Sequence, residues 1–409
     1  MGDRLIGLAG IVFIIGVAVL LSTNRRAIDR RIVISAFLLQ AAIAAFALYL
    51  PAGKKAFEFL AFGVQAILNF SRAGIDMVFG PLADMGGAVS FAIHVLPIII
   101  FFSALMSVLY HLGIMQFVVR IIGGGLRLLI GTQPVESLNA AANMFVGQTE
   151  APLVIRPYLP RLTGPQLFAV MVAGLASVAG TVLAAYAAIG IKLEYLLPAA
   201  FMAAPGGLLM AKIMMPDEDH HAVVEPDSPP LAEEKPQHVN VIHAAAMGAR
   251  DGLMLAVNIG AMLLAFVSLI ALFNGIVGLF GGWVGFEDLT LEKMLGVIFA
   301  PVMYLLSVPW EEAVTAGGLF GEKLILNEFV AFIHMGELTG ELSPRAEAIV
   351  TFSLCGFANV SSIAILLGGL GSLIPEKRDM IARYGLRAVA AASLSNLMSA
   401  ALAGLLLSV

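Results

Sequence analysis

The sequence predicts an all-α protein that crosses a membrane many times, and its composition and hydropathy pattern are the grounds. Of its 409 residues, 60% are hydrophobic and only 12% are charged, whereas a soluble chain carries about a quarter of charged residues. Runs of roughly 18 or more apolar residues match the hydrocarbon thickness of a bilayer. The strict alternation that is typical of an outer-membrane barrel is missing. The apolar runs lie at 5–22, 33–50, 95–109, 252–273 and 388–409.

We expect the first apolar run to be a spanning helix rather than a cleaved signal peptide. A signal peptide carries its positive charge before the apolar stretch. Here the basic cluster follows the stretch, as Arg25, Arg26, Arg30 and Arg31. Because basic residues favour the cytoplasmic side, residues 23–32 are predicted to be cytoplasmic and the N-terminus to lie outside.

The remaining elements follow in order along the chain. Residues 5–22 and 33–50 predict an antiparallel pair of spans, and the amphipathic stretch 53–75 predicts a helix at the membrane interface. A long helix is expected from about 92 to 119. The stretch 216–240, rich in Pro, Asp and Glu, predicts a solvated loop between two membrane bundles. Further spans are expected at 165–187, 193–213, 251–279 and 386–409.

Two segments do not fit a simple spanning helix. Residues 134–157 and about 290–321 each contain a short apolar arm, a polar break and another short arm. Non-helical backbone at membrane depth survives only where it is buried in protein or lines a watery cavity. Both segments therefore predict re-entrant helical hairpins.

The polar breaks of these two hairpins share a short pattern. Val146-Gly-Gln-Thr-Glu150-Ala151 and Val308-Pro-Trp-Glu-Glu312-Ala313 both read V-x-x-x-E-A, and we interpret them as counterparts. Basic residues bracket the first hairpin and mainly acidic ones the second, which predicts that the first opens to the cytoplasm and the second to the outside. Two such hairpins indicate an inverted repeat. The bracketing residues are Arg120, Arg127, Arg156 and Arg161 for the first, and Glu287, Asp288, Glu292 and Glu322, against Lys293 and Lys323, for the second.

A matched interruption follows each hairpin. Small and polar residues occupy 174–180 after the first hairpin and 356–362 after the second. They predict helices broken near the bilayer midplane, where transporters place their substrate and ion sites. Close helix packing through small residues is the alternative interpretation.

Carboxylates inside a membrane need a reason, because each costs about 2.5–3.5 kcal/mol or more. Glu150 follows Gln148 and Thr149, and Glu328 follows Asn327 inside an apolar stretch. Glu312, beside Glu311, is interpreted as a cap or brace. An amide and two hydroxyls, Asn359, Ser361 and Ser362, could join a carboxylate in binding vicinal hydroxyls, although the serines could instead bond the preceding helical turn.

Several classes of function are not supported. The only cysteine, Cys355, is expected to be a packing residue, and His94, His111 and His334 to be structural or interfacial. The chain has no H-E-x-x-H zinc motif, P-loop or G-x-S-x-G elbow. Much of the net charge of -5 comes from the short acidic segment 217–234, so a nucleic-acid partner is not supported. We therefore expect neither an enzyme nor an organic cofactor.

Three long motifs resemble the concentrative nucleoside transporters, especially their bacterial members. They are VGQTEAPLVIRPYL, NEFVAF and LCGFANVSSIAILLGGLGSL, and the resemblance extends to ASLSNLMSAALAG near the end. It implies a homotrimer in the bacterial inner membrane, with both termini periplasmic. Each protomer would have eight transmembrane helices and two opposed hairpins. A transport domain would carry uridine, cytidine or adenosine with sodium by an elevator movement against the scaffold.

The resemblance also implies which residues bind the substrates. The nucleobase would be contacted by Gln148, Thr149 and Glu150, and the ribose by Glu328, Asn359 and Ser362, with Phe357 packed nearby. The sodium ligands would be Asn143, Val146, Ser177 and Val178, mainly through carbonyl oxygens, which suits a hard cation.

The domain division and the alternatives complete the expectations. We expect scaffold at 1–119 and 251–282, transport domain at 120–213 and 283–409, and an acidic loop with a connecting helix at 214–250. The alternatives are a proton-coupled nucleoside symporter, an intramembrane hydrolase with Glu150 or Glu328 as general base, and a structural membrane scaffold.

Overall fold

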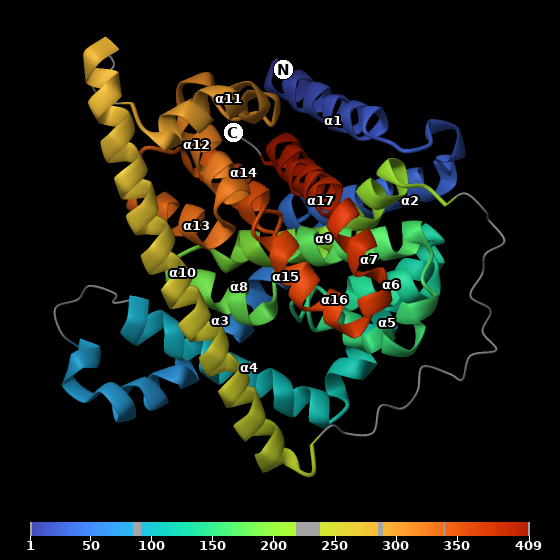
Figure 1. Cartoon of the computed structure of the whole chain (residues 1–409), viewed down its shortest axis with the longest axis vertical. Coiled ribbons are helices and arrows are strands. Elements are labelled where there is room, and N and C mark those ends of the chain that lie inside the picture. Colours follow the sequence, from blue (N-terminus) through green and yellow to red (C-terminus); the bar gives the residue numbers. More distant parts are fainter. Residues whose placement is uncertain (1, 85–90, 218–237, 285–288, 339, 408–409) are drawn as a thin grey trace.

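The computed structural model describes residues 2–84, 91–217, 238–284, 289–338 and 340–407. Within these ranges all regular structure is helical, which confirms the predicted all-α class (Figure 1). Most of the expected solvated loop, together with Glu287 and Asp288, lies outside the described residues.

The first two helices follow the first two apolar runs. α1 spans Gly2–Leu20 and α2 spans Arg30–Leu48. Asp29 caps α2, because its side chain accepts a hydrogen bond from the backbone N–H of Arg31 at 2.8 Å. α1 packs mainly against α17, whereas α2 packs mainly against α9. The two helices thus have different main partners in the core.

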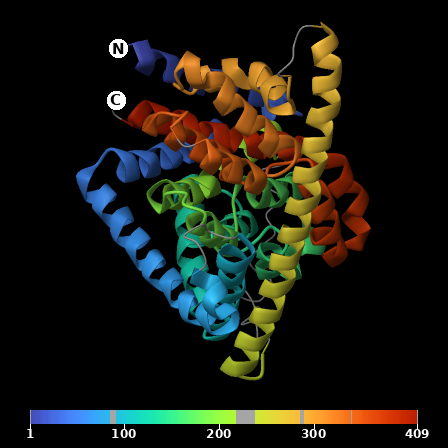
Figure 2. The ribbon, with the colours of Figure 1, turned by 90° about the vertical axis from the view of Figure 1, so that its left-hand side faces the viewer.

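The single long helix expected at 92–119 is wrong. α4 spans Leu96–His111, after a π-helical turn at Phe91–Val95, and α5 spans Ile114–Ile130. Gly113 between them has a φ of 78°, a left-handed conformation that glycine adopts at little cost. The apolar pattern continues through this turn, so hydropathy alone does not reveal it. The amphipathic stretch 53–75 is helical as expected, within α3, Pro51–Phe79, which lies along the outside of the molecule (Figure 2).

Four helical segments follow and form the first half of the core. They are α6, Pro134–Ala142; the 3-10 helix η4, Ala151–Arg161; α7, Gly164–Ala176; and α8, Gly180–Ala188. We call residues 143–150, between α6 and η4, the first tip, and residues 177–179, between α7 and α8, the first break. The interruption predicted in the span 165–187 is thus confirmed. α9, Leu193–Met214, packs beside α7, and a buried ion pair of 2.6 Å between Lys212 and Glu136 fastens it to α6.

The longest helix, α10, spans Val241–Val284 and crosses the whole molecule (Figures 1 and 2). It begins well before residue 251, where a span was expected. Gly248 and Gly252 let it approach α4 closely. A Cβ at these positions would lie 2.6 Å from the Cβ of Ser107 and 2.7 Å from the Cβ of Ser103, respectively. Most of the remaining surface of α10 is exposed and apolar.

The described part of the second half of the chain contains seven further α-helices. The chain bends by 117° between α11, Leu291–Leu305, and α12, Trp310–Ile325. They are followed by α13, Glu328–Glu337; α14, Pro344–Leu354; α15, Ser362–Gly368; α16, Leu370–Leu373; and α17, Arg378–Leu406. We call residues 326–327, between α12 and α13, the second tip, and residues 355–361, between α14 and α15, the second break.

The proposed pairing of Glu150 with Glu312 is wrong. The first tip packs on the first break, where the N–H of Gly180 donates to the carbonyl of Phe145 at 2.9 Å. The equivalent bond in the second half runs from the N–H of Val360 to the carbonyl of Leu324 at 3.1 Å, beside the second tip. Glu312 lies at the earlier bend and accepts bonds from the backbone N–H and hydroxyl of Ser343, the brace that was expected. A four-residue pattern was too short to identify structural counterparts.

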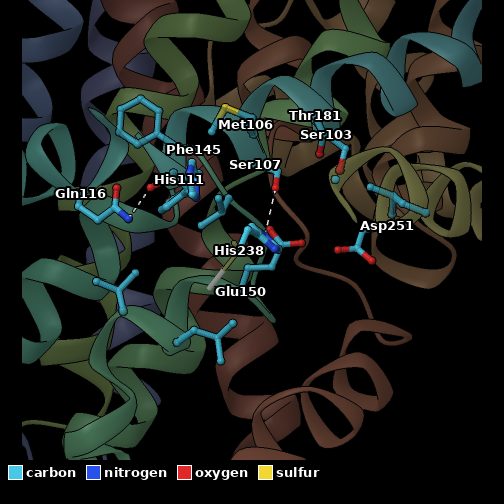
Figure 3. A pocket seen from close by; sticks show the side chains of 16 residues that line it. Ser103, Met106, Ser107, His111, Gln116, Phe145, Glu150, Thr181, His238 and Asp251 are labelled. Atoms are coloured by element: carbon cyan, nitrogen blue, oxygen red, sulfur yellow. Dashed lines mark hydrogen bonds between the residues drawn. The ribbon is translucent and has the colours of Figure 1, made fainter. Parts of the chain in front are cut away.

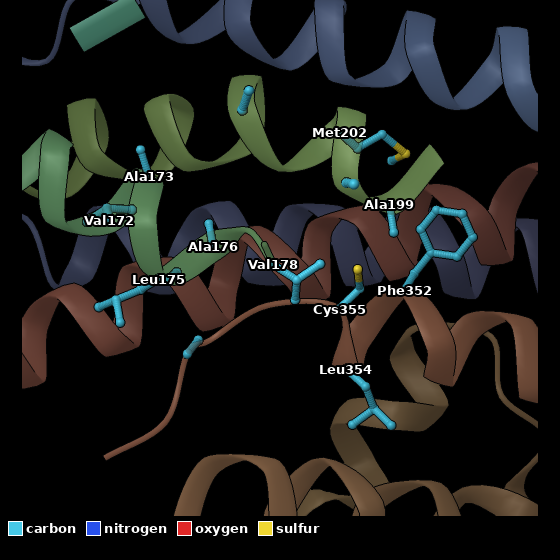
Figure 4. Packing of buried hydrophobic residues seen from close by; sticks show 14 of the residues in the cluster. Val172, Ala173, Leu175, Ala176, Val178, Ala199, Met202, Phe352, Leu354 and Cys355 are labelled. Atoms are coloured by element: carbon cyan, nitrogen blue, oxygen red, sulfur yellow. The ribbon is translucent and has the colours of Figure 1, made fainter. Parts of the chain in front are cut away.

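Six helices of the described residues are long and apolar enough to cross a membrane, or seven if α11 and α12 together form one span. The centre of the molecule is formed by α7, α9 and the C-terminal half of α17, which are almost wholly buried. Small side chains let α7 and α9 approach closely: a Cβ on Gly207 of α9 would lie 3.4 Å from the Cβ of Ala176. Val178 and Cys355 lie in the same core (Figure 4). This core holds the two breaks against each other.

Candidate functional site

The two broken helices meet at their breaks. The backbone N–H of Phe357 donates a hydrogen bond to the carbonyl oxygen of Ser177 at 3.1 Å. The last carbonyls of a helix have no partner within the helix. Here one side chain of α17 donates hydrogen bonds to carbonyl oxygens at the C-terminal ends of α7 and α14. The Nδ2 of Asn396 donates to the carbonyl oxygen of Ala176 at 2.8 Å and to that of Cys355 at 3.0 Å.

This junction leaves no room for a side chain at position 356. A Cβ on Gly356 would lie 2.4 Å from the Oδ1 of Asn396 and 2.7 Å from the carbonyl oxygen of Ala176. The glycine is therefore required by the close approach of the breaks.

Two charges that were counted as flanking the second hairpin are in fact buried. The Nζ of Lys323 donates to the carbonyl oxygen of Ser353 at 2.7 Å and to the Oδ1 of Asn396 at 2.7 Å. Glu322 pairs with the Nδ1 of His334 at 3.0 Å. Charge alone does not reveal burial, so these two residues carry no information on membrane orientation, and the predicted orientation depends on the remaining flanking charges. Lys323 also lies at the C-terminal end of α14, where the helix dipole favours a cation.

Glu328 is the first residue of α13 and is only 4% exposed. The side chain of Asn327 caps the helix by accepting a bond from the N–H of Val330 at 2.9 Å. The hydroxyl of Tyr186, on α8, donates to the Oε1 of Glu328 at 2.8 Å, and the Nδ2 of Asn359 donates to the Oε2 at 3.2 Å. A carboxylate offers about four lone-pair sites, so these two side-chain donors do not exhaust its capacity to accept bonds from a ligand.

Asn359 and Ser361 lie in the second break, and Ser362 is the first residue of α15. The Oδ1 of Asn359 accepts bonds from the hydroxyl of Ser361 at 2.7 Å and from the N–H of Ser362 at 2.9 Å. These donors fix the amide so that its NH₂ group faces Glu328. The hydroxyl of Ser361 thus bonds to the Asn359 side chain rather than to the carbonyl of a preceding helical turn. Ser362 is buried and Phe357 is partly buried.

Three polar residues at this junction were not expected from the sequence: Tyr186, Lys323 and Asn396. The ring of Tyr186 packs against Phe329 and Phe332, with centroids 5.1 and 4.5 Å apart. Each of the three interrupts a buried, mainly apolar helix. That is the signal which singled out Glu328, so it could have identified them too.

The residues expected to contact the nucleobase lie in the first tip. Gln148 is buried, and its Oε1 has no hydrogen-bond partner among the described residues. Thr149 packs against Gly369, where a Cβ would lie 2.4 Å from the Cγ2 of Thr149. Glu150 is exposed and accepts a bond from the N–H of Gly147 at 3.1 Å.

Glu150 lines a cavity of about 310 Å³ between the first tip and helices α4 and α10 (Figure 3). Asp251 of α10 and His111 of α4 also line it. His238 reaches it from the segment before α10 and lies 3.4 Å from the hydroxyl of Ser107. None of the other expected nucleoside ligands lines this cavity. The structure thus brings Glu328, Asn359 and Ser362 together, while Glu150 faces a separate opening.

The expected sodium ligands lie where the first tip meets the first break. Asn143 is the C-cap of α6, and its Nδ2 donates to the carbonyl of Asn139 at 2.9 Å. Its Oδ1 is buried and has no hydrogen-bond partner among the described residues. The hydroxyl of Ser177 donates to the carbonyl of Ala173 at 3.0 Å, and Val146 and Val178 are both buried. A buried oxygen without a donor, close to carbonyl groups, suits a hard cation.

Three family models match successive parts of the chain. Residues 9–82 match the N-terminus of the Na+ dependent nucleoside transporters, and residues 195–404 match their C-terminus. Residues 92–193 match a model described as nucleoside recognition. Together they cover most of the chain.

Relatives match over almost the full length. The chain is 50% identical to an uncharacterized transporter of Haemophilus influenzae, over 97% of this chain and 96% of that protein. It is 47% identical to nucleoside permease NupC of Helicobacter pylori, over 98% of each. Identity to sodium/nucleoside cotransporter 1 of Mus musculus is 36%, over 99% of this chain and 64% of that protein.

Solved structures of CNTnw match equally well. CNTnw in an inward-facing substrate-bound state is 47% identical, with a TM-score of 0.94 over 99% of this chain and 98% of that one. A CNTnw variant in an outward-facing state has the same identity and a TM-score of 0.93, over 98% and 97%.

Proposed function

The chain belongs to the family of Na+ dependent nucleoside transporters, and we propose that it imports nucleosides across the bacterial inner membrane by symport with sodium. The family is one of transporters, not of enzymes. We further propose uridine, cytidine and adenosine as substrates. The observation that carries the proposal is the buried carboxylate of Glu328 and the polar groups around it.

Glu328 is suited to bind the ribose. Its oxygens already accept one bond each, from Tyr186 and Asn359, and both donors hold the carboxylate in place. The remaining lone pairs can accept two hydroxyl groups that are adjacent on a ring, which is the arrangement in ribose. Asn359 and Ser362, at the second break, complete this side of the site, and Phe357 packs beside it.

The first tip is the proposed site for the nucleobase. The buried Oε1 of Gln148 has no partner and could accept a bond from a base, while Thr149 and Glu150 add a hydroxyl and a carboxylate. Together they offer both donors and acceptors to a polar ring. The site would close by bringing the first tip to the second break.

We place sodium between the first tip and the first break, as cargo moved together with the nucleoside. Asn143 supports this position, because its buried Oδ1 lacks a donor. Val146, Ser177 and Val178 would supply the other oxygens. Transporters commonly use the carbonyls of unwound helices for sodium.

We infer a topology of eight spans and two re-entrant hairpins. The spans are α1, α2, α4, α7 with α8, α9, α10, α14 with α15, and α17. The hairpins are α6 with η4, and α12 with α13, related as an inverted repeat. The exposed, amphipathic α3 would lie at the interface, and both termini would face the periplasm.

Transport by an elevator movement in a homotrimer is part of the same proposal. The solved structures of CNTnw in inward-facing, intermediate and outward-facing states support alternating access for this fold. Residues 120–213 and 283–409 would form the moving domain, and residues 1–119 and 251–282 the scaffold, joined by 214–250. The exposed apolar face of α10 suits contact with lipid or with another protomer.

Equilibrium binding to the purified protein tests the substrate class. Uridine should bind in sodium buffer, whereas uracil, which lacks the ribose, and uridine monophosphate, which adds a charge, should bind much more weakly. Equal binding of uracil and uridine would contradict the ribose site.

A further inference from the structure

One side chain outside the proposed ligand set touches both halves of the site. Asn396, on α17, is 2% exposed and donates one bond to each break, to the carbonyls of Ala176 and Cys355. Ala176 directly precedes Ser177, a proposed sodium ligand. Cys355 is in the second break, which carries the proposed ribose ligands.

The orientation of this amide is fixed by its partners. The Nζ of Lys323 donates to the Oδ1 of Asn396 at 2.7 Å. The two carbonyl oxygens can only accept, so they face the Nδ2. Lys323 in turn bonds the carbonyl of Ser353 at 2.7 Å, which anchors it to the last turn of α14. α12, which leads to the second tip, is thereby joined to the same point.

A backbone bond lies beside the side-chain bonds. The N–H of Phe357 donates to the carbonyl of Ser177, and Gly356 lets the two breaks come this close. Three hydrogen bonds thus run through the contact between the breaks, two of them from Asn396. A displacement of the Ala176 carbonyl changes the position that Asn396 can take, and with it the position of Cys355.

We propose that Asn396, held in place by Lys323, couples sodium binding at the first break to nucleoside binding at the second. This inference rests on the proposed function. Asn396 is a positioning residue, because it is assigned to neither ligand. Coupling of two sites is a free energy shared by both ligands. Removing the shared contact therefore reduces the effect of sodium on uridine affinity, and equally the effect of uridine on sodium affinity.

Asn396→Asp tests the proposal with little change of shape. The substitution keeps an oxygen for Lys323 but removes both donors to the breaks. Ser393→Ala is the matched control. Ser393 is a buried polar residue of α17, and among the described residues its hydroxyl bonds only the carbonyl of Val389 in its own helix, at 2.8 Å. The quantity measured is the ratio of the uridine Kd without sodium to that in saturating sodium.

We expect Asn396→Asp to reduce this ratio about tenfold, within the range of typical coupling energies, and Ser393→Ala to leave it unchanged. A merely structural role would weaken both affinities and preserve the ratio. An unchanged ratio in Asn396→Asp overturns the coupling role while leaving the transport function intact. If the uridine Kd of the wild-type protein does not change with sodium, the proposed sodium-coupled function is overturned, and the coupling role with it.

Hydrogen exchange on the wild-type protein decides the question if the variant does not fold. Sodium alone, without nucleoside, should slow amide exchange in the first tip and also in the second break, including the N–H of Phe357. Slower exchange confined to the first tip would overturn the proposal. Slower exchange at both, lost in Asn396→Asp where that protein folds, supports it.

Discussion

The hydroxyl of Tyr186 donates a hydrogen bond to the Oε1 of Glu328 at 2.8 Å, although 142 residues separate them in the chain. Tyr186 lies on the helix after the first break, and Glu328 follows the second tip. The buried carboxylate is therefore held jointly by the two halves of the molecule. The binding of a ligand to Glu328 therefore depends also on the position of α8, the helix that carries Tyr186.

Glu328→Gln tests the ribose assignment. Hydrogen bonds to a charged group contribute about 1.5–3 kcal/mol, so uridine affinity should fall by about one to two orders of magnitude. An analogue without the two ribose hydroxyls should lose much less, because it already lacks the interaction. Binding of both ligands to the purified variant checks this. Equal losses would refute the assignment, and failure of the protein to assemble would favour a structural role.

Tyr186→Phe removes the donor while keeping the ring that packs against Phe329 and Phe332. The carboxylate loses one of its two protein partners and its fixed orientation. Uridine affinity should fall about tenfold, the effect of one bond to a charged group. The melting temperature of Tyr186→Phe should be closer to that of the wild-type protein than the melting temperature of Tyr186→Ala, because Tyr186→Ala also loses the ring. Wild-type affinity in Tyr186→Phe would show that the bond does not position Glu328.

Gly356→Ala tests the close contact between the breaks. The added methyl group would lie 2.4 Å from the Oδ1 of Asn396, so the breaks must separate. Overpacking of this kind costs about 1–3 kcal/mol, and the melting temperature in detergent should fall. Gly368→Ala is the matched control, because a Cβ there meets no atom within 4 Å. Equal melting temperatures for the two variants would contradict the predicted clash.

Cysteine labelling tests the inverted topology. In a Cys355→Ala background, thiols introduced at the exposed positions Arg161 and Lys293 should react with impermeant reagents from opposite sides of the membrane. Arg161 follows the first hairpin and should be cytoplasmic, whereas Lys293 precedes the second and should be periplasmic. Labelling of both from one side would rule out two opposed hairpins.

Some of these features were predictable from the sequence because their signals are local. Hydropathy predicted the helical class and several spans, and the cost of burying a carboxylate identified Glu328. The runs of small residues around Ser177 and Asn359 predicted both breaks. Each of these inferences needs only neighbouring residues.

Other features depend on which helices meet in space. The turn at Gly113 interrupts an apolar pattern that itself does not change. The second tip at 326–327 is recognised only by its contact with the second break. The chance match of the V-x-x-x-E-A pattern at Glu312 directed the prediction to the wrong segment. Lys323 was interpreted as a surface charge because burial is set by the packing of α14 and α17 around it. Asn396 has a role only once Ala176 and Cys355 lie side by side.

Uptake by proteoliposomes that contain only this protein tests the central claim most directly. Labelled uridine is supplied outside, with gradients of sodium, potassium or protons imposed separately. Sodium-coupled symport predicts accumulation driven by an inward sodium gradient, and its loss when potassium or choline replaces sodium. Uptake that is unchanged without sodium but stimulated by external acid would contradict sodium coupling and indicate proton symport, while no uridine uptake under any gradient would contradict nucleoside transport itself.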